Sequence, residues 1–332
     1  MFGVESGTWQ GYIGAHGFDF KEYVTRFQRR TRPQSSGFSS LDAALGGGYR
    51  PGLHILGGVP GSGKSALALQ IAANIAAAGR PAVYYSLELP CDEANERLMS
   101  MISITMSDPF PFGDVGRQAE AFTHQSHDLV LKHSQGEITQ DELESGLMEL
   151  QRNCSVLAAA AQCEASYRNL VIADNMTAVK DINQDLYNLA AGGVKPFVVV
   201  DYLQYAVTGD PKLDSGIAYE KVSAIADDLT LTSKNLGIPI VLVSALNRDA
   251  VKDGKEPTLQ AFRGSGHIEY NATTASVLIE EKEPEAIVAD GCKRVNLWIL
   301  KNRQGPAGLS VPFDADLAHN HFSMGKNAPA AL

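Results

Sequence analysis

Residues 58–65, GVPGSGKS, constrain this chain more than any other segment. They fit the pattern G-x-x-x-x-G-K-S/T, in which glycines let backbone N–H groups point at phosphate oxygens. Lys64 would reach the β- and γ-phosphates, and the Ser65 hydroxyl would bind Mg²⁺. The segment LHILGG before the motif predicts a strand, and SALALQIAANIAAA after it predicts a helix whose N-terminus favours anions. This order predicts a site for ATP and Mg²⁺ made by Gly58, Pro60, Gly61, Ser62, Gly63, Lys64, Ser65 and Ala66.

Composition limits the class of protein. The chain has 332 residues, 44% hydrophobic and 20% charged, which fits one large globular domain or two small ones. Its formal net charge of −10 argues against a protein that binds nucleic acid over its whole surface. This charge does not exclude a narrow basic channel, because binding depends on the local field. Scattered cysteines without a C-x-x-C motif predict reduced thiols rather than a zinc site. With no long apolar run and no basic-then-apolar leader, we expect a cytoplasmic protein without a membrane partner.

Residues 1–34 are expected to form a segment separate from the core. Apolar residues at helical spacing (Phe20, Tyr23, Val24 and Phe27) lie among basic ones (Lys21, Arg26, Arg29, Arg30 and Arg32), which predicts an amphipathic basic helix. Three interpretations stay open: the helix docks on its own domain, it is a linker that docks on a neighbouring subunit, or it contacts nucleic acid. Residues 31–37 are expected to form a loop, and residues 326–332 a tail.

From Gly37 onward, predicted strands and helices alternate. Strands are expected at 82–88, 170–174, 197–203 and 238–246, and helices at 91–102, 179–190 and 219–236, the last ending at Gly237. Residues 276–281, 295–302 and 309–313 resemble the strands of a meander. A polar stretch from about 105 to 165 predicts a helical hairpin or excursion. Near-continuous apolar strands between helices indicate an α/β fold whose mostly parallel central sheet is covered on both faces.

Two carboxylates are candidates for the chemistry of hydrolysis. Asp201 ends the apolar run FVVVD, where a carboxylate faces the ligand crevice of an open α/β sheet, and it could hold Mg²⁺ with Ser65. The alternative is a helix-capping Asp. Glu88 ends YYSLE and would polarise water if its strand lay beside the strand before the phosphate loop. The alternative for Glu88 is a surface carboxylate.

An ordered set of blocks resembles a known family. The blocks are SGFSSLDAALGGGYRPGLHILGGVPGSGKSALALQIA, YSLELPCDEANERLMS, VVVDYLQ, SALNR, FRGSGHIEYNATTASVLI and VNLWILKNRQGPAG. Together they resemble the C-terminal ATPase domain of DnaB-type replicative helicases, a RecA-like P-loop fold, over residues 35–325. The resemblance implies a ring hexamer that translocates on single-stranded DNA with ATP bound between subunits, and a primase or loader as a further partner.

The resemblance also implies roles for individual residues. Glu88 matches the catalytic glutamate, and Asp201 the acid on the Mg²⁺ side. Lys301 and Arg303 match cations that reach into the neighbouring subunit's site, where a cation at the γ-phosphate contributes to the rate; a solvated strand end is the alternative. Arg263, Gly264 and Gly266 match a channel loop that holds the DNA backbone; an ordinary Gly-rich turn is the alternative.

The sequence departs from the family pattern in three places. Ala245 stands where the family usually has a glutamine that senses the γ-phosphate, and a methyl group cannot hydrogen-bond a phosphate; Ser244 or Asn247 could substitute. The family's N-terminal primase-binding domain is replaced by the short basic segment, and the stretch at 105–165 is longer than expected and could be a partner-binding insertion. Ala245 and the short basic segment in place of the N-terminal domain favour a non-unwinding regulatory or assembly ATPase as the first alternative. A filament-forming RecA-type recombinase is the second.

Overall fold

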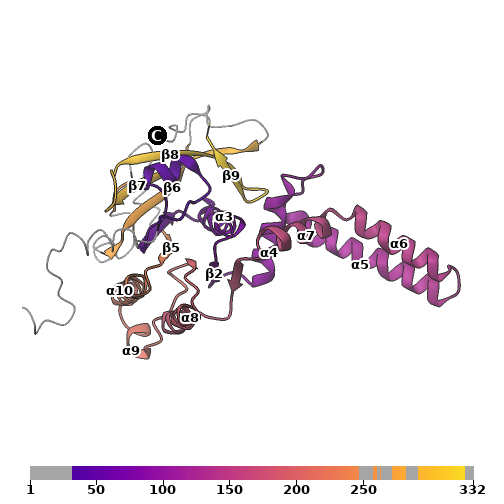
Figure 1. The fold of residues 1–332 in the computed structure, drawn as a ribbon, viewed down its shortest axis with the longest axis horizontal. Helices are drawn as coiled ribbons and strands as arrows, with labels where there is room; N and C mark the ends of the chain where they lie inside the picture. The colour runs from indigo at the N-terminus through magenta and orange to yellow at the C-terminus, as the bar shows by residue number, and fades with distance from the viewer. Residues whose placement is uncertain (1–31, 247–256, 260–261, 263–270, 282–290, 326–332) are drawn as a thin grey trace, which may run out of the picture. The chain divides into compact units, whose positions relative to one another are not determined.

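One mixed sheet organises the molecule (Figure 1). The computed structural model describes residues 32–246, 257–259, 262, 271–281 and 291–325. Within these residues the strand order is β3-β2-β4-β5-β1-β6-β7-β8-β9. Neighbouring strands are parallel from β3 to β6 and antiparallel from β6 to β9. The bounds are β1 Gly52–Gly58, β2 Ala82–Ser86, β3 Leu170–Ala173, β4 Phe197–Asp201, β5 Pro239–Ala245, β6 Thr274–Glu280, β7 Lys293–Asn302, β8 Leu309–Asp316 and β9 His321–Met324.

The sheet has a hydrophobic core on each face, which confirms the predicted α/β class. Alternate residues of β4 serve opposite cores: Phe197 and Val199 face one, Val198 and Val200 the other. The first core is shared with α2 (Ser39–Ala44) and α3 (Lys64–Ala77), and the second with α8 (Val179–Ala191) and α10 (Ala218–Leu236). Because both faces are covered, the central strands β1, β4 and β5 are buried along nearly their whole length and do not alternate between buried and exposed residues.

Residues 91–166 form four helices beside the sheet. They are α4 (Cys91–Ser103), α5 (Phe112–Ser134), α6 (Gln140–Asn153) and α7 (Ser155–Ser166), and a short α9 (Pro211–Asp214) occurs later. α5 and α6 lie side by side as a hairpin (Figure 1), and a capping box of Thr139 and Glu142 starts α6. Of their side chains, only Val115 and Leu143 are buried. The segment is therefore helical, as expected.

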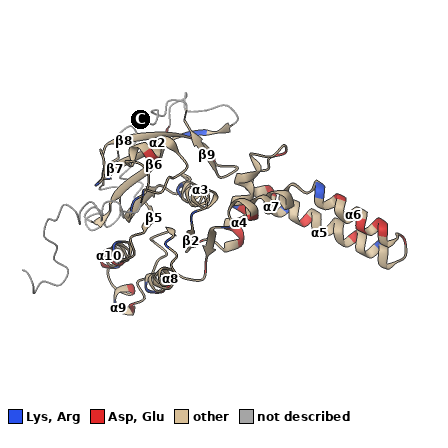
Figure 2. Cartoon of the chain, in the orientation of Figure 1, with Lys and Arg blue, Asp and Glu red and all other residues tan. Residues whose placement is uncertain are grey.

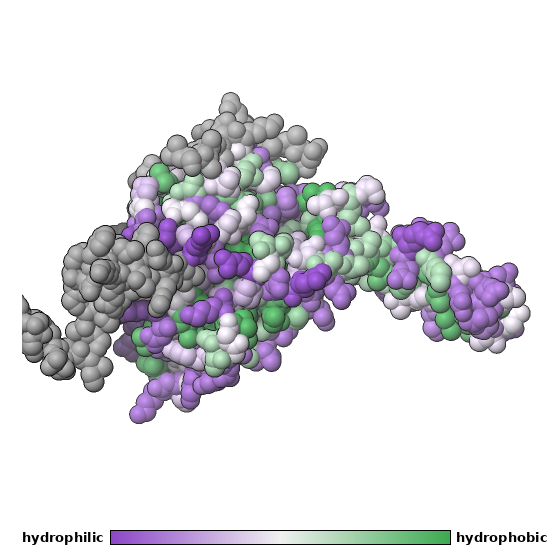
Figure 3. Space-filling model, in the orientation of Figure 1, coloured by the Kyte–Doolittle hydropathy of each residue, from purple (hydrophilic) through white to green (hydrophobic). Residues whose placement is uncertain are grey.

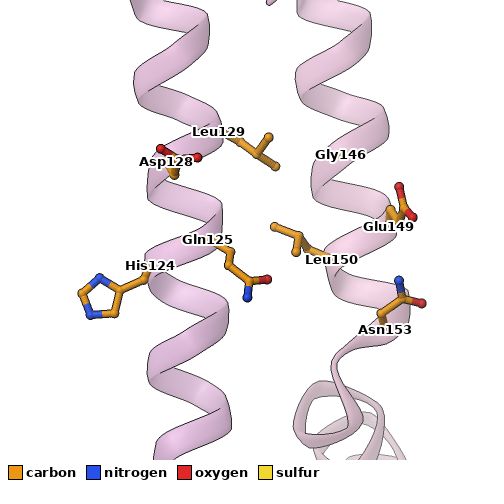
Figure 4. Close-up of a pocket in the computed structure, with 8 residues that line it drawn as sticks. All are labelled: His124, Gln125, Asp128, Leu129, Gly146, Glu149, Leu150 and Asn153. Atoms are coloured by element: carbon orange, nitrogen blue, oxygen red, sulfur yellow. The ribbon is translucent and has the colours of Figure 1, made fainter.

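The α5–α6 hairpin is mostly polar on its surface. Acidic residues outnumber basic ones along it in Figure 2, and hydrophilic residues cover most of it in the view of Figure 3. A groove of about 550 Å³ runs between the helices, where Leu129 and Leu150 point toward each other near Gly146 (Figure 4). Added at Gly146, a Cβ would lie 3.0 Å from Leu129, so the glycine allows the close approach of the helices.

Most predicted elements agree with the structure to within a few residues. α10 ends at Gly237, which adopts a left-handed conformation (φ 67°), as the stop signal predicts. β9 was not predicted at all. By its internal contacts the chain divides into Met1–Arg32 and Pro33–Leu332, and the predicted basic helix lies outside the described residues. Among the helices that the structure describes, none is both long and apolar enough to cross a membrane.

Candidate functional site

The phosphate loop joins β1, in the middle of the sheet, to the first residue of α3. Gly61 and Gly63 have φ values of 80° and 84°, a conformation that glycine adopts without steric cost. Gly63 is the N-cap residue of α3, so the unpaired N–H groups of the first helical turn face the loop. The Nζ atom of Lys64 lies 5.5 Å from the centroid of the Tyr202 ring. The predicted strand–loop–helix arrangement is confirmed.

A cavity of about 300 Å³ opens at the phosphate loop. Its lining includes predicted residues from the loop and Glu88. Four further lining residues were not singled out from the sequence as site residues: Leu89, Arg97, Leu317 and Asn320. The complete lining is Gly61, Gly63, Lys64, Ser65, Ala66, Glu88, Leu89, Arg97, Leu317 and Asn320. The cavity thus combines residues 61–97 with residues 317–320, which are far apart in the sequence.

Ser65 and Asp201 meet beside this cavity. The Ser65 hydroxyl donates a hydrogen bond to Asp201 Oδ1 over 3.2 Å, and the Tyr84 hydroxyl donates to Asp201 Oδ2. Burial raises the pKa of Asp201 above its usual range, whereas these hydrogen bonds and the positive charge of Lys64 oppose that rise. A hydroxyl and a carboxylate beside a phosphate loop are the oxygen ligands that Mg²⁺ prefers. The residues present therefore fit the ion.

Glu88 lines the cavity, but not for the predicted reason. β2 does not lie beside β1, because β4 and β5 separate them. Ser86 of β2 pairs instead with Asp201 of β4, and the N–H of Leu87 donates to the carbonyl oxygen of Asp201 over 2.7 Å. Since parallel strands bring their carboxyl ends to one edge of the sheet, Glu88 still reaches the cavity. The strand adjacency on which this interpretation of Glu88 depended is therefore not present.

Arg97 brings a cation to the cavity from α4. Its Nη2 pairs with Glu93 Oε1 at 2.9 Å, and its guanidinium lies 5.4 Å from the centroid of the Phe112 ring. Its Nε is buried without a hydrogen-bond partner. A sequence signal for Arg97 as a site residue did exist. Arg97 lies next to Leu98 and three residues after Ala94, which places it at the border of the buried face of α4.

Lys301 and Arg303 do not line the cavity of their own chain. Asn302 pairs with Thr274, the first residue of β6, and Thr274 pairs with His54 of β1. Gly58, where the phosphate loop begins, lies four residues beyond His54, which is roughly 13 Å along β1. Asn302 is also two strand spacings, or roughly 10 Å, away from β1 across the sheet. Arg303 is exposed, and its N–H donates to the carbonyl oxygen of Thr273 over 2.9 Å. The two cations therefore lie at the edge of the sheet opposite the phosphate loop.

Ala245 ends β5 at the same edge as the phosphate loop. Its N–H donates to Gln204 Oε1 over 3.1 Å, and Gln204 Nε2 lies 3.3 Å from Ser244 Oγ. Ser244 is fully buried and does not line the cavity, which argues against it as a substitute for the family glutamine. Asn247 lies outside the described residues.

The predicted DNA-binding residues Arg263, Gly264 and Gly266 also lie outside the described residues. Their described neighbour Phe262 is buried and bridges to Leu246. A Cβ at Gly57 would lie 2.5 Å from the Phe262 ring, so the ring packs directly on the backbone of β1, one residue before the phosphate loop begins.

Known proteins resemble this chain over most of its length. The model of the DnaB-like helicase C-terminal domain matches residues 34–129 and 119–322, two stretches that overlap within α5. The Replicative DNA helicase DnaB of Treponema pallidum is 26% identical over 302 residues, which cover 89% of this chain and 58% of that protein. The chain thus spans little more than half the length of this curated relative.

Solved structures show the same fold. One of them, a separate ATPase domain, has a TM-score of 0.69 at 20% identity over 94% of this chain and 100% of its own. A DnaB-like replicative helicase, described with its interactions with primase, has a TM-score of 0.66 at 20% identity over 93% of this chain and 67% of its own. The fold is RecA-like, and the chain belongs to the DnaB-like helicase C-terminal domain family.

Proposed function

We propose that this chain is the ATPase of a motor that moves along single-stranded DNA in replication and hydrolyses ATP between the subunits of a homo-hexameric ring. One observation carries the proposal. Lys64 and Glu88 line one cavity, beside which Ser65 and Asp201 meet, whereas Lys301 and Arg303 lie at the opposite edge of the sheet. We infer that a second copy would complete such a site by presenting its own Lys301 and Arg303.

Each residue then has a role set by its position. Lys64 and the N–H groups at the start of α3 would bind phosphate oxygens. Ser65 and Asp201 would hold Mg²⁺, which neutralises charge on the phosphates when bound. Glu88 would accept a proton from the attacking water, and Arg303 of the neighbouring copy would stabilise the charge that develops in the transition state. Arg97 would add a cation from within the same chain.

The DNA partner is supported by family membership and by the packing of Phe262. This ring lies on Gly57, and the next residue, Arg263, begins the segment that resembles a channel loop. A primase or loader is a further candidate partner, because a solved relative is described with primase. We place the protein in the cytoplasm.

The test is ATP turnover by the purified chain with and without single-stranded DNA, followed by unwinding of 5′- and 3′-tailed forks. The proposal expects turnover that DNA stimulates, opening of one fork type, and loss of both activities in Lys64→Ala. Turnover that DNA does not affect, in a protein that leaves both forks closed, contradicts the motor function.

A second candidate is a non-unwinding regulatory or assembly ATPase. Ala245 favours it, because the strand end where the family has a glutamine carries only a methyl group. This candidate predicts DNA-stimulated turnover with both forks left closed. Introducing Ala245→Gln would then be expected to strengthen the coupling of turnover to movement.

A further inference from the structure

A turn from the C-terminal part of the chain closes one side of the phosphate-loop cavity. It comprises residues 317–320 and joins β8 to β9, whose last pair is Asp316 with His321. Leu317 and Asn320 both line the cavity. Asn320 is 8% exposed and has φ 52°, a left-handed conformation that asparagine tolerates better than most residues.

Three contacts hold the turn against the loop. The side-chain amide of Gln70, on α3, accepts a hydrogen bond from the Phe322 N–H (2.7 Å) and donates one to the Phe322 carbonyl oxygen (2.9 Å). The side chains of Leu317 and Phe322 fill the space where Gly63 lacks a Cβ. On the other side, the Phe112 N–H donates to the Ala318 carbonyl oxygen over 2.8 Å. The position of Asn320 relative to the phosphate loop is therefore fixed by packing and hydrogen bonds.

Buried hydrogen-bond donors without partners are concentrated around the phosphate loop and its cavity. In the described part of the chain, five buried side-chain polar atoms have no hydrogen-bond partner. Three of them belong to residues of the loop or the cavity: Ser62 Oγ, Arg97 Nε and Asn320 Nδ2. Buried donors are nearly always paired, because an unpaired one loses its hydrogen bonds to water without compensation. A ligand rich in acceptors would pair them, and a nucleotide in this cavity is such a ligand.

We propose that the Asn320 side chain donates a hydrogen bond to the nucleotide bound at the phosphate loop. The turn thus contributes a ligand-binding residue from the end of the fold, more than two hundred residues after the loop itself. The inference rests on the proposed function, because it needs a nucleotide in this cavity. It assigns Asn320 to binding and leaves the chemical step to Glu88 and the cations.

Binding of a fluorescent ADP analogue, mant-ADP, tests the proposal without requiring turnover. Asn320→Gly removes the amide, and glycine suits the left-handed backbone, so folding is retained. Asn320→Asp keeps the shape but replaces the donor with a negative charge. Asn188→Asp, on the exposed side of α8, is the control for a change of charge far from the cavity. Thermal unfolding without nucleotide checks that each variant folds.

The proposal expects Asn320→Gly to weaken mant-ADP binding about tenfold. Asn320→Asp is expected to weaken it further because the carboxylate repels phosphate, while Asn188→Asp binds like the wild type. Competition by pyrophosphate shows which part of the nucleotide accepts the hydrogen bond. If Asn320→Gly weakens pyrophosphate binding as much as mant-ADP binding, the acceptor is on the phosphates. If pyrophosphate binding is unchanged, the acceptor is on the nucleoside. Binding by both Asn320 variants within twofold of the wild type overturns the inference and leaves the proposed function intact. Failure of the wild type to bind mant-ADP would remove both.

Discussion

Replacing Gly63 with alanine tests how the C-terminal turn packs on the phosphate loop. Gly63 has φ 84°, which costs alanine about 1–2 kcal/mol. A Cβ there would also lie 2.7 Å from Leu317 Cδ2 and 2.8 Å from Phe322 Cζ. Overpacking of this kind costs about 1–3 kcal/mol. We therefore expect Gly63→Ala to lower the free energy of unfolding by about 3 kcal/mol.

Gly79 provides a matched control. Its φ is 78°, and a Cβ there would meet no atom within 4 Å. Gly79→Ala carries the same backbone cost without the clash, so we expect a loss of only about 1 kcal/mol. The assay is urea unfolding of the nucleotide-free protein, comparing midpoints at equal m-values. Equal destabilisation by the two substitutions would show that the turn does not pack on Gly63 as described.

Three further predictions follow from buried or cavity-lining groups. Burial lowers the pKa of His54 to about 4, although the hydrogen bond with the Arg50 carbonyl opposes this shift. As the pH falls, the unfolded chain binds a proton at His54 before the folded chain does. The free energy of unfolding therefore decreases as the pH drops from about 6.5 toward 4. Between pH 7.5 and 5 this should cost about 2 kcal/mol, and His54→Gln should reduce the loss of stability over this range by about that amount, measured by urea unfolding at each pH. Gln70→Ala leaves the buried N–H and carbonyl of Phe322 unpaired and should destabilise the protein by about 2–4 kcal/mol, measured the same way. Arg97→Ala should lower kcat/KM for ATP at least tenfold with little change in unfolding midpoint, and an unchanged kcat/KM would remove Arg97 from the site.

Local patterns in the sequence predicted the core of the fold and half of the site. The phosphate loop is a contiguous motif between a strand and a helix, and FVVVD carries Asp201 to the edge where ligands bind. Both features depend only on neighbours in sequence and on the shared edge of parallel strands. The end of α10 at Gly237 could likewise be predicted from neighbouring residues alone.

The remaining features depend on contacts between distant segments. Strand order could not be deduced from the sequence. The adjacency of β2 and β1, considered for Glu88 only as a condition, is absent because β4 and β5 lie between them. β9 is short, and its HFSM sequence is no stronger a strand signal than many loops. Asn320 lines the cavity because contacts with Gln70, Gly63 and Phe112 position its turn, and no local sequence pattern encodes those contacts.

A subunit-mixing experiment tests the shared site most directly. Lys64→Ala and Arg303→Ala are each expected to hydrolyse ATP at a small fraction of the wild-type rate. In an equal mixture of the two variants that exchanges subunits, about a quarter of the interfaces combine an intact Lys64 in one copy with an intact Arg303 in the next. ATP turnover should therefore return to about a quarter of the wild-type rate. Full activity of Arg303→Ala alone, or a mixture of co-assembled variants that stays silent, would contradict the account.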